Sequence, residues 1–234
     1  MSNPFQLFRL QQLDTQLDRA HNRLLEIQSE IKKQEATLRQ VQVQHEKSEA
    51  LLQDSRKSLR KAEENVQQQS LKIEQNEAML YSGKVRNPKE LQDMQNEVAA
   101  LKRYLSVLED RQLEAMMMLE ELLSGHSQVT EQLTEITVQV STTVKLLNEE
   151  RENLTREIQR LEVERKATYG AIPAEELELY EGLRQKRRGV AVAKVVDKNC
   201  EACGSTLNAS LLHAARSLNQ ICRCDSCGRI LYAG

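Results

Sequence analysis

The chain has 234 residues, a net charge of −2 and 29% charged residues, but only 3% aromatic residues and no tryptophan. So few aromatic side chains argue against a conventional globular core, because aromatic rings supply much of the buried area of such a core. No apolar run approaches the ~20 residues that a bilayer span requires, and the first residues lack a charged segment followed by a long apolar one. We therefore expect a long helical protein that is cytoplasmic and does not insert into a membrane.

Two series of apolar residues repeat every seven positions. The first begins at Leu10 and ends at Leu80, and His45 is its one polar member. The second begins at Leu91 and ends at Leu161, with polar residues at Gln112 and His126. A sustained seven-residue period is typical of a left-handed coiled coil. Residues 1–170 are therefore predicted to form two long coiled-coil helices.

Residues 81–88 separate the two series and carry the signals of a turn. Gly83 suits the left-handed end of a helix, Asn87 is a good N-cap, and Pro88 suits the first helical position. So short a link makes the two helices antiparallel neighbours. The turn is also basic, which suits either a purely structural tip or a contact surface for a partner. The residues assigned to that surface are Tyr81, Lys84, Arg86, Asn87, Pro88 and Lys89.

The C-terminal part, residues 171–234, differs from the hairpin in charge and composition. From Arg184 to the end there are nine Lys/Arg and three Asp/Glu, a net charge of +6, whereas the preceding residues carry −8. A short helix is predicted from Pro173 to about Arg187, and a strand at residues 189–196, where β-branched residues alternate with others. Further on, Asn208 is predicted to cap a short helix that extends to about Leu218.

All five cysteines lie in this basic part, and four of them form two C-x-x-C-G motifs separated by twenty residues. Two residues between thiolates let both sulfurs bind one tetrahedral ion, and clustered cysteines in a reducing cytosol more often bind metal than form disulfides. We expect one structural Zn²⁺, although four thiolates also suit iron. The predicted ligands are Cys200, Cys203, Cys224 and Cys227. Cys222 is interpreted as a bystander, with alternate ligation as the other possibility.

Several of these segments resemble a known family. The tip sequence VRNPKEL (85–91), the strand sequence GVAVAKV, the two C-x-x-C-G motifs and the ending CGRILY are similar to the bacterial C4-type zinc-ribbon coiled-coil family. The resemblance covers nearly the whole chain. It implies a mainly α fold in which a long antiparallel coiled-coil hairpin carries a small C-terminal β zinc ribbon. It also implies nucleic-acid binding, and some members are linked to transcription or protein-export partners.

The basic charge of the C-terminal part favours a non-enzymatic protein that binds nucleic acid, RNA in particular, because Lys and Arg make the phosphate contacts. The residues assigned to this role are Arg184, Lys186, Arg187, Arg188, Lys194 and Lys198. The alternative is that these side chains pack against the acidic helices. Base stacking has little support, since only Tyr180 and Tyr232 lie nearby in the sequence.

A second function class is open, namely a protein–protein adaptor or scaffold for transcription or export machinery. In that case the coiled coil and its tip would contact a protein assembly, and the chain is also suited to homodimerisation. An enzyme is not expected, because no residues pair a nucleophile with a base.

Overall fold

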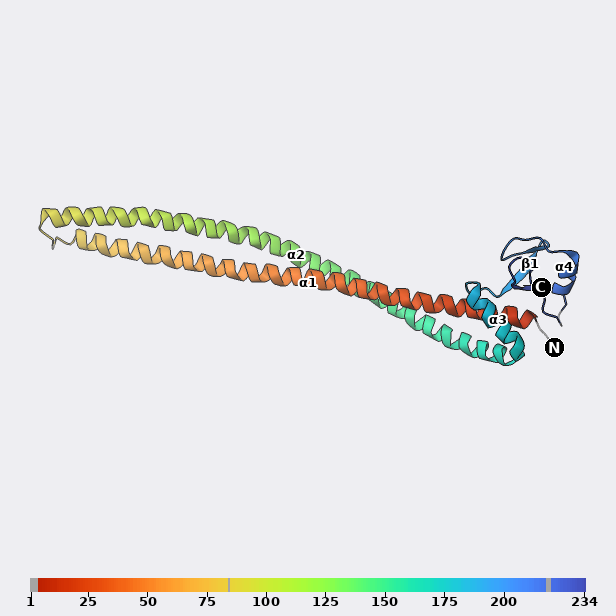
Figure 1. The fold of residues 1–234 in the computed structure, drawn as a ribbon. Helices are drawn as coiled ribbons and strands as arrows, with labels where there is room; N and C mark the ends of the chain where they lie inside the picture. Colours follow the sequence, from red (N-terminus) through yellow and green to blue (C-terminus); the bar gives the residue numbers. More distant parts are fainter. Residues whose placement is uncertain (1–3, 84, 218–219) are drawn as a thin grey trace. The chain divides into compact units, whose positions relative to one another are not determined.

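The computed structural model describes residues 4–83, 85–217 and 220–234. Figure 1 shows the chain order of its elements: two long helices come first, then a third helix and a small region of strands. The elements are α1 (Pro4–Leu80), α2 (Pro88–Gly170), α3 (Ala174–Lys186), β1 (Val192–Val196), β2 (Asn199–Cys200), α4 (Ala209–Ala215) and β3 (Ile230–Tyr232). The predicted fold class, a mainly helical antiparallel hairpin followed by a small sheet, is confirmed.

Contacts group the chain into two compact units. Unit 1 comprises residues 1–32 and 144–234, and unit 2 comprises residues 33–143. The first turns of α1 thus fall in the same unit as the C-terminal region, and the predicted domain division at residue 170 stays a prediction. Within the part of the chain that the structure describes, no helix is both long enough and apolar enough to cross a bilayer.

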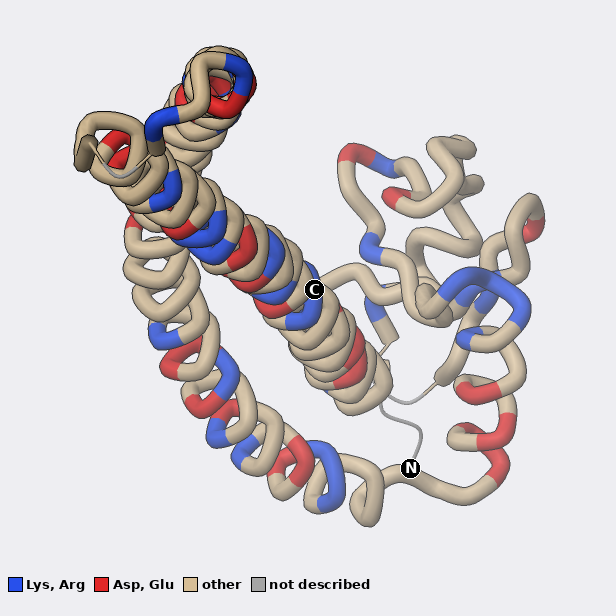
Figure 2. The backbone as a smooth tube through the Cα atoms, turned by 90° about the vertical axis from the view of Figure 1, so that its left-hand side faces the viewer, with Lys and Arg blue, Asp and Glu red and all other residues tan. Residues whose placement is uncertain are grey.

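In unit 2, α1 and α2 pair along the apolar positions of the heptad series. Leu52 and Ile73 of α1 are buried, as are Val98 and Leu108 of α2. Polar contacts between the helices fix their register: the Gln69 side chain donates to the carbonyl oxygen of Leu101 at 3.0 Å. Both basic and acidic residues recur along the length of both helices (Figure 2). The heptad pattern therefore predicted the buried seam correctly.

The histidines of the two heptad series meet in unit 2. The rings of His45 and His126 lie 4.9 Å apart between centroids, and the Ser48 hydroxyl lies 3.2 Å from His126 Nδ1. At the tip, Asn87 Oδ1 accepts a hydrogen bond from the backbone N–H of Lys89 at 3.0 Å, as expected of an N-cap.

In unit 1, the same two helices pack through buried aliphatic residues. These are Leu13, Leu17 and Ala20 of α1 with Ile158 and Leu161 of α2. Beyond α2, α3 begins just after Pro173 and ends at Lys186, close to the predicted bounds. Its first turn is acidic and its last turn basic, a polarity that suits the helix dipole.

The small sheet of unit 1 has the strand order β2-β1-β3. β1 pairs antiparallel with β2 and parallel with β3, with Lys194 opposite Tyr232. The predicted strand at 189–196 is confirmed for residues 192–196. Asn208 caps α4 as predicted, its Oδ1 accepting from the backbone N–H of Leu211 at 2.8 Å, but α4 ends at Ala215.

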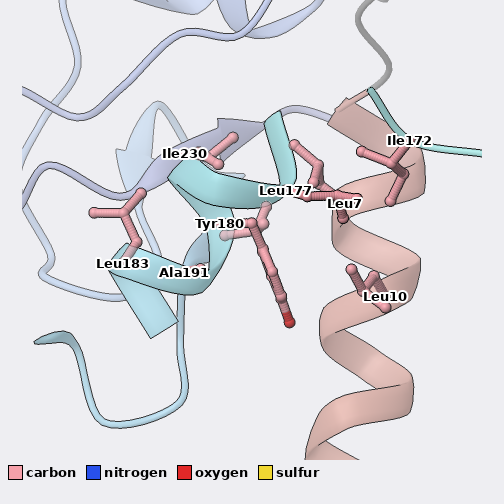
Figure 3. Close-up of a cluster of buried hydrophobic side chains, with 9 residues drawn as sticks. Leu7, Leu10, Ile172, Leu177, Tyr180, Leu183, Ala191 and Ile230 are labelled. Atoms are coloured by element: carbon pink, nitrogen blue, oxygen red, sulfur yellow. The ribbon is translucent and has the colours of Figure 1, made fainter. Parts of the chain in front are cut away.

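One buried cluster joins α1, α3 and the sheet. Figure 3 shows Leu7 and Leu10 of α1 facing Tyr180 of α3, with Ile230 of β3 nearby, and all four are fully buried. The ring of Tyr180 lies inside this core and is therefore not open to stacking on bases. The spacing of Leu177, Tyr180 and Leu183 places them on one face of α3, and all three are buried. The spacing does not show that residues about 170 positions earlier cover this face.

The Gln11 side chain of α1 forms hydrogen bonds with the backbone at the start of the sheet. Gln11 Oε1 accepts hydrogen bonds from the backbone N–H groups of Ala191 at 2.7 Å and Val192 at 2.6 Å. Its Nε2 donates to the carbonyl oxygen of Val192 at 2.7 Å. Because Gln11 is buried, these three bonds satisfy polar backbone groups that water does not reach.

Candidate metal centre and basic surface

The four predicted ligands come together at one point of unit 1. The Sγ atoms of Cys200, Cys203, Cys224 and Cys227 all lie within 4.8 Å of one another. Cys200 Sγ lies 3.8 Å from Cys227 Sγ, and Cys203 Sγ lies 3.7 Å from Cys224 Sγ. Two thiolates that bind one tetrahedral Zn²⁺ at ~2.3 Å are about 3.8 Å apart. The sulfur atoms therefore have the spacing that a four-thiolate metal site requires.

Each cysteine pair sits on the same kind of turn. The N–H of Gly204 donates to the carbonyl oxygen of Cys200 at 2.7 Å, and the N–H of Gly228 donates to that of Cys224 at 2.8 Å. Both glycines have positive φ, 74° and 71°. A residue with a side chain is strained there, which explains why glycine follows each C-x-x-C.

The thiols differ in acidity because their surroundings differ. Hydrogen bonds from the hydroxyl and backbone N–H of Ser205 lower the pKa of the exposed Cys203 to about 6. Burial raises the pKa of Cys200 to about 12. A metal ion would therefore meet one thiolate already formed and displace the proton of a buried thiol. With all four thiolates bound, no position is left for a substrate, so the arrangement suits a structural ion.

Cys222 lies outside the group of four sulfur atoms. It is buried in the apolar cluster beneath the site, with Ala193 and Leu231, and burial raises its pKa. Its carbonyl oxygen accepts from the N–H of Leu231 at 2.9 Å. This placement fits the bystander interpretation.

Arg184, the first of the predicted nucleic-acid contacts, is engaged within the protein. Its Nη2 donates to Asp18 Oδ2 at 2.5 Å, and its Nε lies 3.5 Å from Asp14 Oδ2. Burial alone would lower its pKa, but the hydrogen bond to Asp18 and the charge of Asp14 raise it. The alternative that basic residues pack against the acidic helices thus holds for Arg184.

The other predicted contacts lie at the surface. Lys186, Arg187, Arg188, Lys194 and Lys198 are all exposed. Among the described residues, none of the five forms an ion pair with a carboxylate. Figure 2 shows the cationic segment at the end of α3, which follows the acidic first turns of that helix. The five side chains are therefore open to solvent, with Lys194 Nζ 5.0 Å from the centroid of the Phe8 ring.

Two further arginines, which the sequence analysis did not assign, join Arg187 at the second cysteine turn. The Arg223 Nε donates to the carbonyl oxygen of Gly228 at 2.9 Å, and the Arg229 side chain donates to the carbonyl oxygens of Val190 at 2.9 Å and Arg187 at 3.3 Å. A Cβ placed on Gly228 would lie 3.3 Å from Arg223 Nη2 and 4.0 Å from Arg187 Nη2. Two guanidinium groups therefore converge over Gly228.

The residues assigned to the tip lie in unit 2, far in sequence from the cysteines. Tyr81 is 79% exposed, and Arg86, Asn87, Pro88 and Lys89 are exposed as well. Lys84 lies outside the described residues. The tip assignment stays a prediction.

Comparison with known structures shows a shared fold. The chain is similar to CT398 from Chlamydia trachomatis, with a TM-score of 0.78, 19% identity and coverage of 99% of this chain and 97% of that one. It is also similar to a protein from Mycobacterium smegmatis, with a TM-score of 0.76, 21% identity and coverage of 100% and 99%. The HP0958 protein from Helicobacter pylori matches with a TM-score of 0.53, 16% identity and coverage of 100% and 99%.

No curated protein sequence matches the chain significantly. A family model, the CT398-like coiled coil hairpin domain, matches residues 10–188. This range contains α1 from Leu10 onward, the tip, α2 and α3, and it ends before the first cysteine pair. The chain therefore belongs to the CT398-like coiled-coil hairpin family.

Proposed function

We propose that this protein is a non-enzymatic, zinc-binding coiled-coil protein that binds nucleic acid, RNA in particular, through the basic surface beside its four cysteines. The observation that carries the proposal is the convergence of Arg187 and Arg223 over Gly228. Guanidinium groups bind phosphate through two parallel hydrogen bonds, and clustered cations gain affinity by releasing counterions from the nucleic acid.

The metal centre would hold in place the backbone that carries two arginines of this surface. Arg223 precedes Cys224, and Arg229 follows Cys227 by two positions. A zinc ion held by the four thiolates would cross-link the two cysteine turns and so fix the backbone that carries these arginines. The zinc supplies cross-linking and no reaction step.

The placement of the cations favours RNA over duplex DNA. A protein that reads duplex DNA usually places a helix in the major groove. The short helix between the cysteine pairs, α4, contains no Lys or Arg within its bounds. The cations lie instead on turns, on the end of α3 and, for Lys194, on β1, an arrangement suited to phosphates of single-stranded or looped RNA.

The test is binding of a fluorescently labelled RNA by anisotropy over a series of salt concentrations. Replacing Arg187 and Arg188 by Glu should weaken binding by about tenfold or more and reduce the salt dependence. The matched control replaces Arg56 and Lys61 of unit 2 by Glu, since both are exposed and the charge change is the same. Equal loss in both variants would refute a specific role for the basic surface.

A second candidate is the adaptor function, for which the exposed apolar side chains near the tip are the specific observation. Met79 is 58% exposed and Tyr81 is 79% exposed, close in sequence to the cations Arg86 and Lys89. Exposed aromatic and methionine side chains with a basic rim are typical of protein contacts. Cross-linked pull-downs with and without nuclease distinguish the two: partners that persist after nuclease treatment and vanish on Tyr81→Ala support the adaptor.

A further inference from the structure

Three of the seven aromatic residues of the chain come together on one surface of unit 1. The Phe8 and Tyr232 rings are stacked, with centroids 5.0 Å apart and planes 21° from parallel. Phe5 packs against the same tyrosine with centroids 6.1 Å apart. Phe5 and Phe8 belong to the first turns of α1 and Tyr232 to β3, so only the folded chain brings them together.

The three rings are not equally exposed. Phe8 and Tyr232 are half-buried and pack against the cluster that contains Leu7, Leu10 and Ile230. Phe5 is 43% exposed. The rings of Phe8 and Tyr232 are therefore held in place by the core, and Phe5 presents aromatic surface to the solvent.

Cations flank these rings. Lys194, which lies opposite Tyr232 in the sheet register, places its Nζ 5.0 Å from the centroid of Phe8. Arg9 is exposed and follows Phe5 by four positions, so that helical geometry puts it on the same side of α1. Neither cation forms an ion pair with a carboxylate in the part of the chain that the structure describes.

We propose that this surface, formed by Phe5, Phe8, Lys194 and Tyr232, binds unpaired bases of single-stranded nucleic acid. A base stacks on Phe5, and Lys194 and Arg9 contact the adjoining phosphates. The inference rests on the proposed function and names single-stranded nucleic acid as its ligand class. Aromatic rings beside a positively charged groove are how sequence-tolerant single-strand binders hold their ligand, because every base has a flat face to stack.

The chemistry favours nucleic acid over a protein partner. The centre of a protein interface is usually depleted in lysine, whereas here a lysine ammonium group lies over one of the central rings. The C-terminal stretch that contributes Lys194 and Tyr232 has nine Lys/Arg and three Asp/Glu. An anionic ligand with flat apolar groups matches both features.

The absence of tryptophan from the chain makes a specific test possible. Phe5→Trp introduces a single indole at the exposed ring position, and its fluorescence is quenched when a base stacks on it. The probe is a labelled single-stranded RNA of about twelve nucleotides, compared with the same sequence as a duplex. The matched control is Tyr104→Trp, at an aromatic position of unit 2 that is 51% exposed.

In the Phe5→Trp variant, we expect the single-stranded RNA to quench the indole fluorescence. Half-maximal quenching should occur at the RNA concentration that gives half-maximal anisotropy change. The duplex should quench the indole only weakly. The indole of Tyr104→Trp should keep its fluorescence with either RNA. Phe5→Ala should weaken single-strand binding roughly 5- to 150-fold, the range that corresponds to loss of one base–aromatic stack. Phe8 is left intact in these variants because it also covers the core.

The remaining outcomes separate this inference from the proposed function. One outcome is that RNA binds, the indole of Phe5→Trp does not respond and Phe5→Ala keeps its affinity for RNA. This result would overturn the stacking surface and leave the basic surface in place. No binding of either RNA form would overturn both. Another outcome is that cross-links from position 5 to a protein persist after nuclease treatment, while the Phe5→Trp indole does not respond to RNA. This result would assign the surface to a protein partner and also overturn the inference.

Discussion

The hydroxyl group of Tyr180 donates a hydrogen bond to Asp14 Oδ2 at 2.7 Å, and both side chains are buried. The same carboxylate lies 2.5 Å from Arg165 Nε and 3.5 Å from Arg184 Nε. Asp14 therefore joins α1 to α2 and α3 inside unit 1. A carboxylate that is only 2% exposed needs these partners, because an unpaired buried charge is strongly destabilising.

Asp14→Asn should destabilise unit 1 by about 1.5–3 kcal/mol, because Tyr180 and Arg165 lose a charged acceptor while Arg184 keeps Asp18. The measurement is urea unfolding followed by circular dichroism. Asp18→Asn is the matched control, because Asp18 also pairs with Arg184 but is 54% exposed. Its expected cost is at most about 1 kcal/mol. If Asp14→Asn and Asp18→Asn lost similar unfolding free energy, the role of Asp14 as the buried partner that joins α1 to α2 and α3 would be contradicted.

The same hydrogen bond predicts a loss of stability in alkali. Burial, and then the hydrogen bond to Asp14, raise the pKa of Tyr180 above its ordinary value. The folded-state pKa thus exceeds the unfolded value of about 10, so the stabilisation is fully present below that pH and is lost as the pH rises beyond it. Tyr180→Phe should show a smaller fall in unfolding free energy between pH 9 and pH 11 than the native chain. An equal fall in unfolding free energy in the two proteins would refute the assignment of this alkaline loss to Tyr180.

The metal centre predicts one zinc ion per chain. Cys227→Ser should abolish stoichiometric zinc, whereas Cys222→Ser should retain it, because the Cys222 side chain lies in the apolar cluster. Metal content by atomic emission checks both variants. Zinc affinity should also fall as the pH is lowered, since binding must displace the proton from Cys200, whose pKa burial raises to about 12.

Removing the metal should unfold the sheet and leave the long helices formed. Chelation is therefore expected to reduce hydrogen-exchange protection in residues 192–232 while residues 33–143 keep theirs, as unit 2 contains none of the cysteines. Loss of protection along the coiled coil of unit 2 would contradict the independence of the two units.

Gly228 allows a sharper test of the second cysteine turn. Gly228→Ala should destabilise the turn by about 1–2 kcal/mol, because alanine is strained at a φ of 71° and its Cβ would lie 3.3 Å from Arg223 Nη2. Gly182→Ala is the control, since Gly182 lies in α3 and has no atom within 4 Å of the added Cβ. That change should be neutral or stabilise by up to about 1 kcal/mol. Thermal unfolding of the zinc-loaded protein measures both.

The features that depend on local sequence were predictable. A seven-residue period predicts a coiled-coil seam, and the spacing of the two C-x-x-C-G motifs predicts that the four sulfur atoms meet, because each pattern follows directly from the local geometry. The basic surface was predicted only in part. Arg223 and Arg229 were missed, since their position beside Arg187 depends on the second cysteine turn folding back onto the end of α3.

Contacts between distant segments were not predictable. Asp14 and Tyr180 are 166 positions apart, and Gln11 and Val192 are 181 apart. Periodicity shows which face of a helix is apolar but not which segment covers it. For the same reason Phe5 and Phe8 gave no indication that they would meet Tyr232. The helical spacing of Tyr180 with Leu177 and Leu183 indicated an apolar face but not which segment covers it.

The three hydrogen bonds of Gln11 also have a consequence for biosynthesis. Gln11 leaves the ribosome early, and its partner Ala191 follows 180 residues later. At ~5–20 residues per second the interval is roughly 10–40 s. During that time the hairpin can form from its tip, while Leu7 and Leu10 have no sheet to cover them. Within α1, the first turns thus wait longest for the residues that cover them in the folded protein.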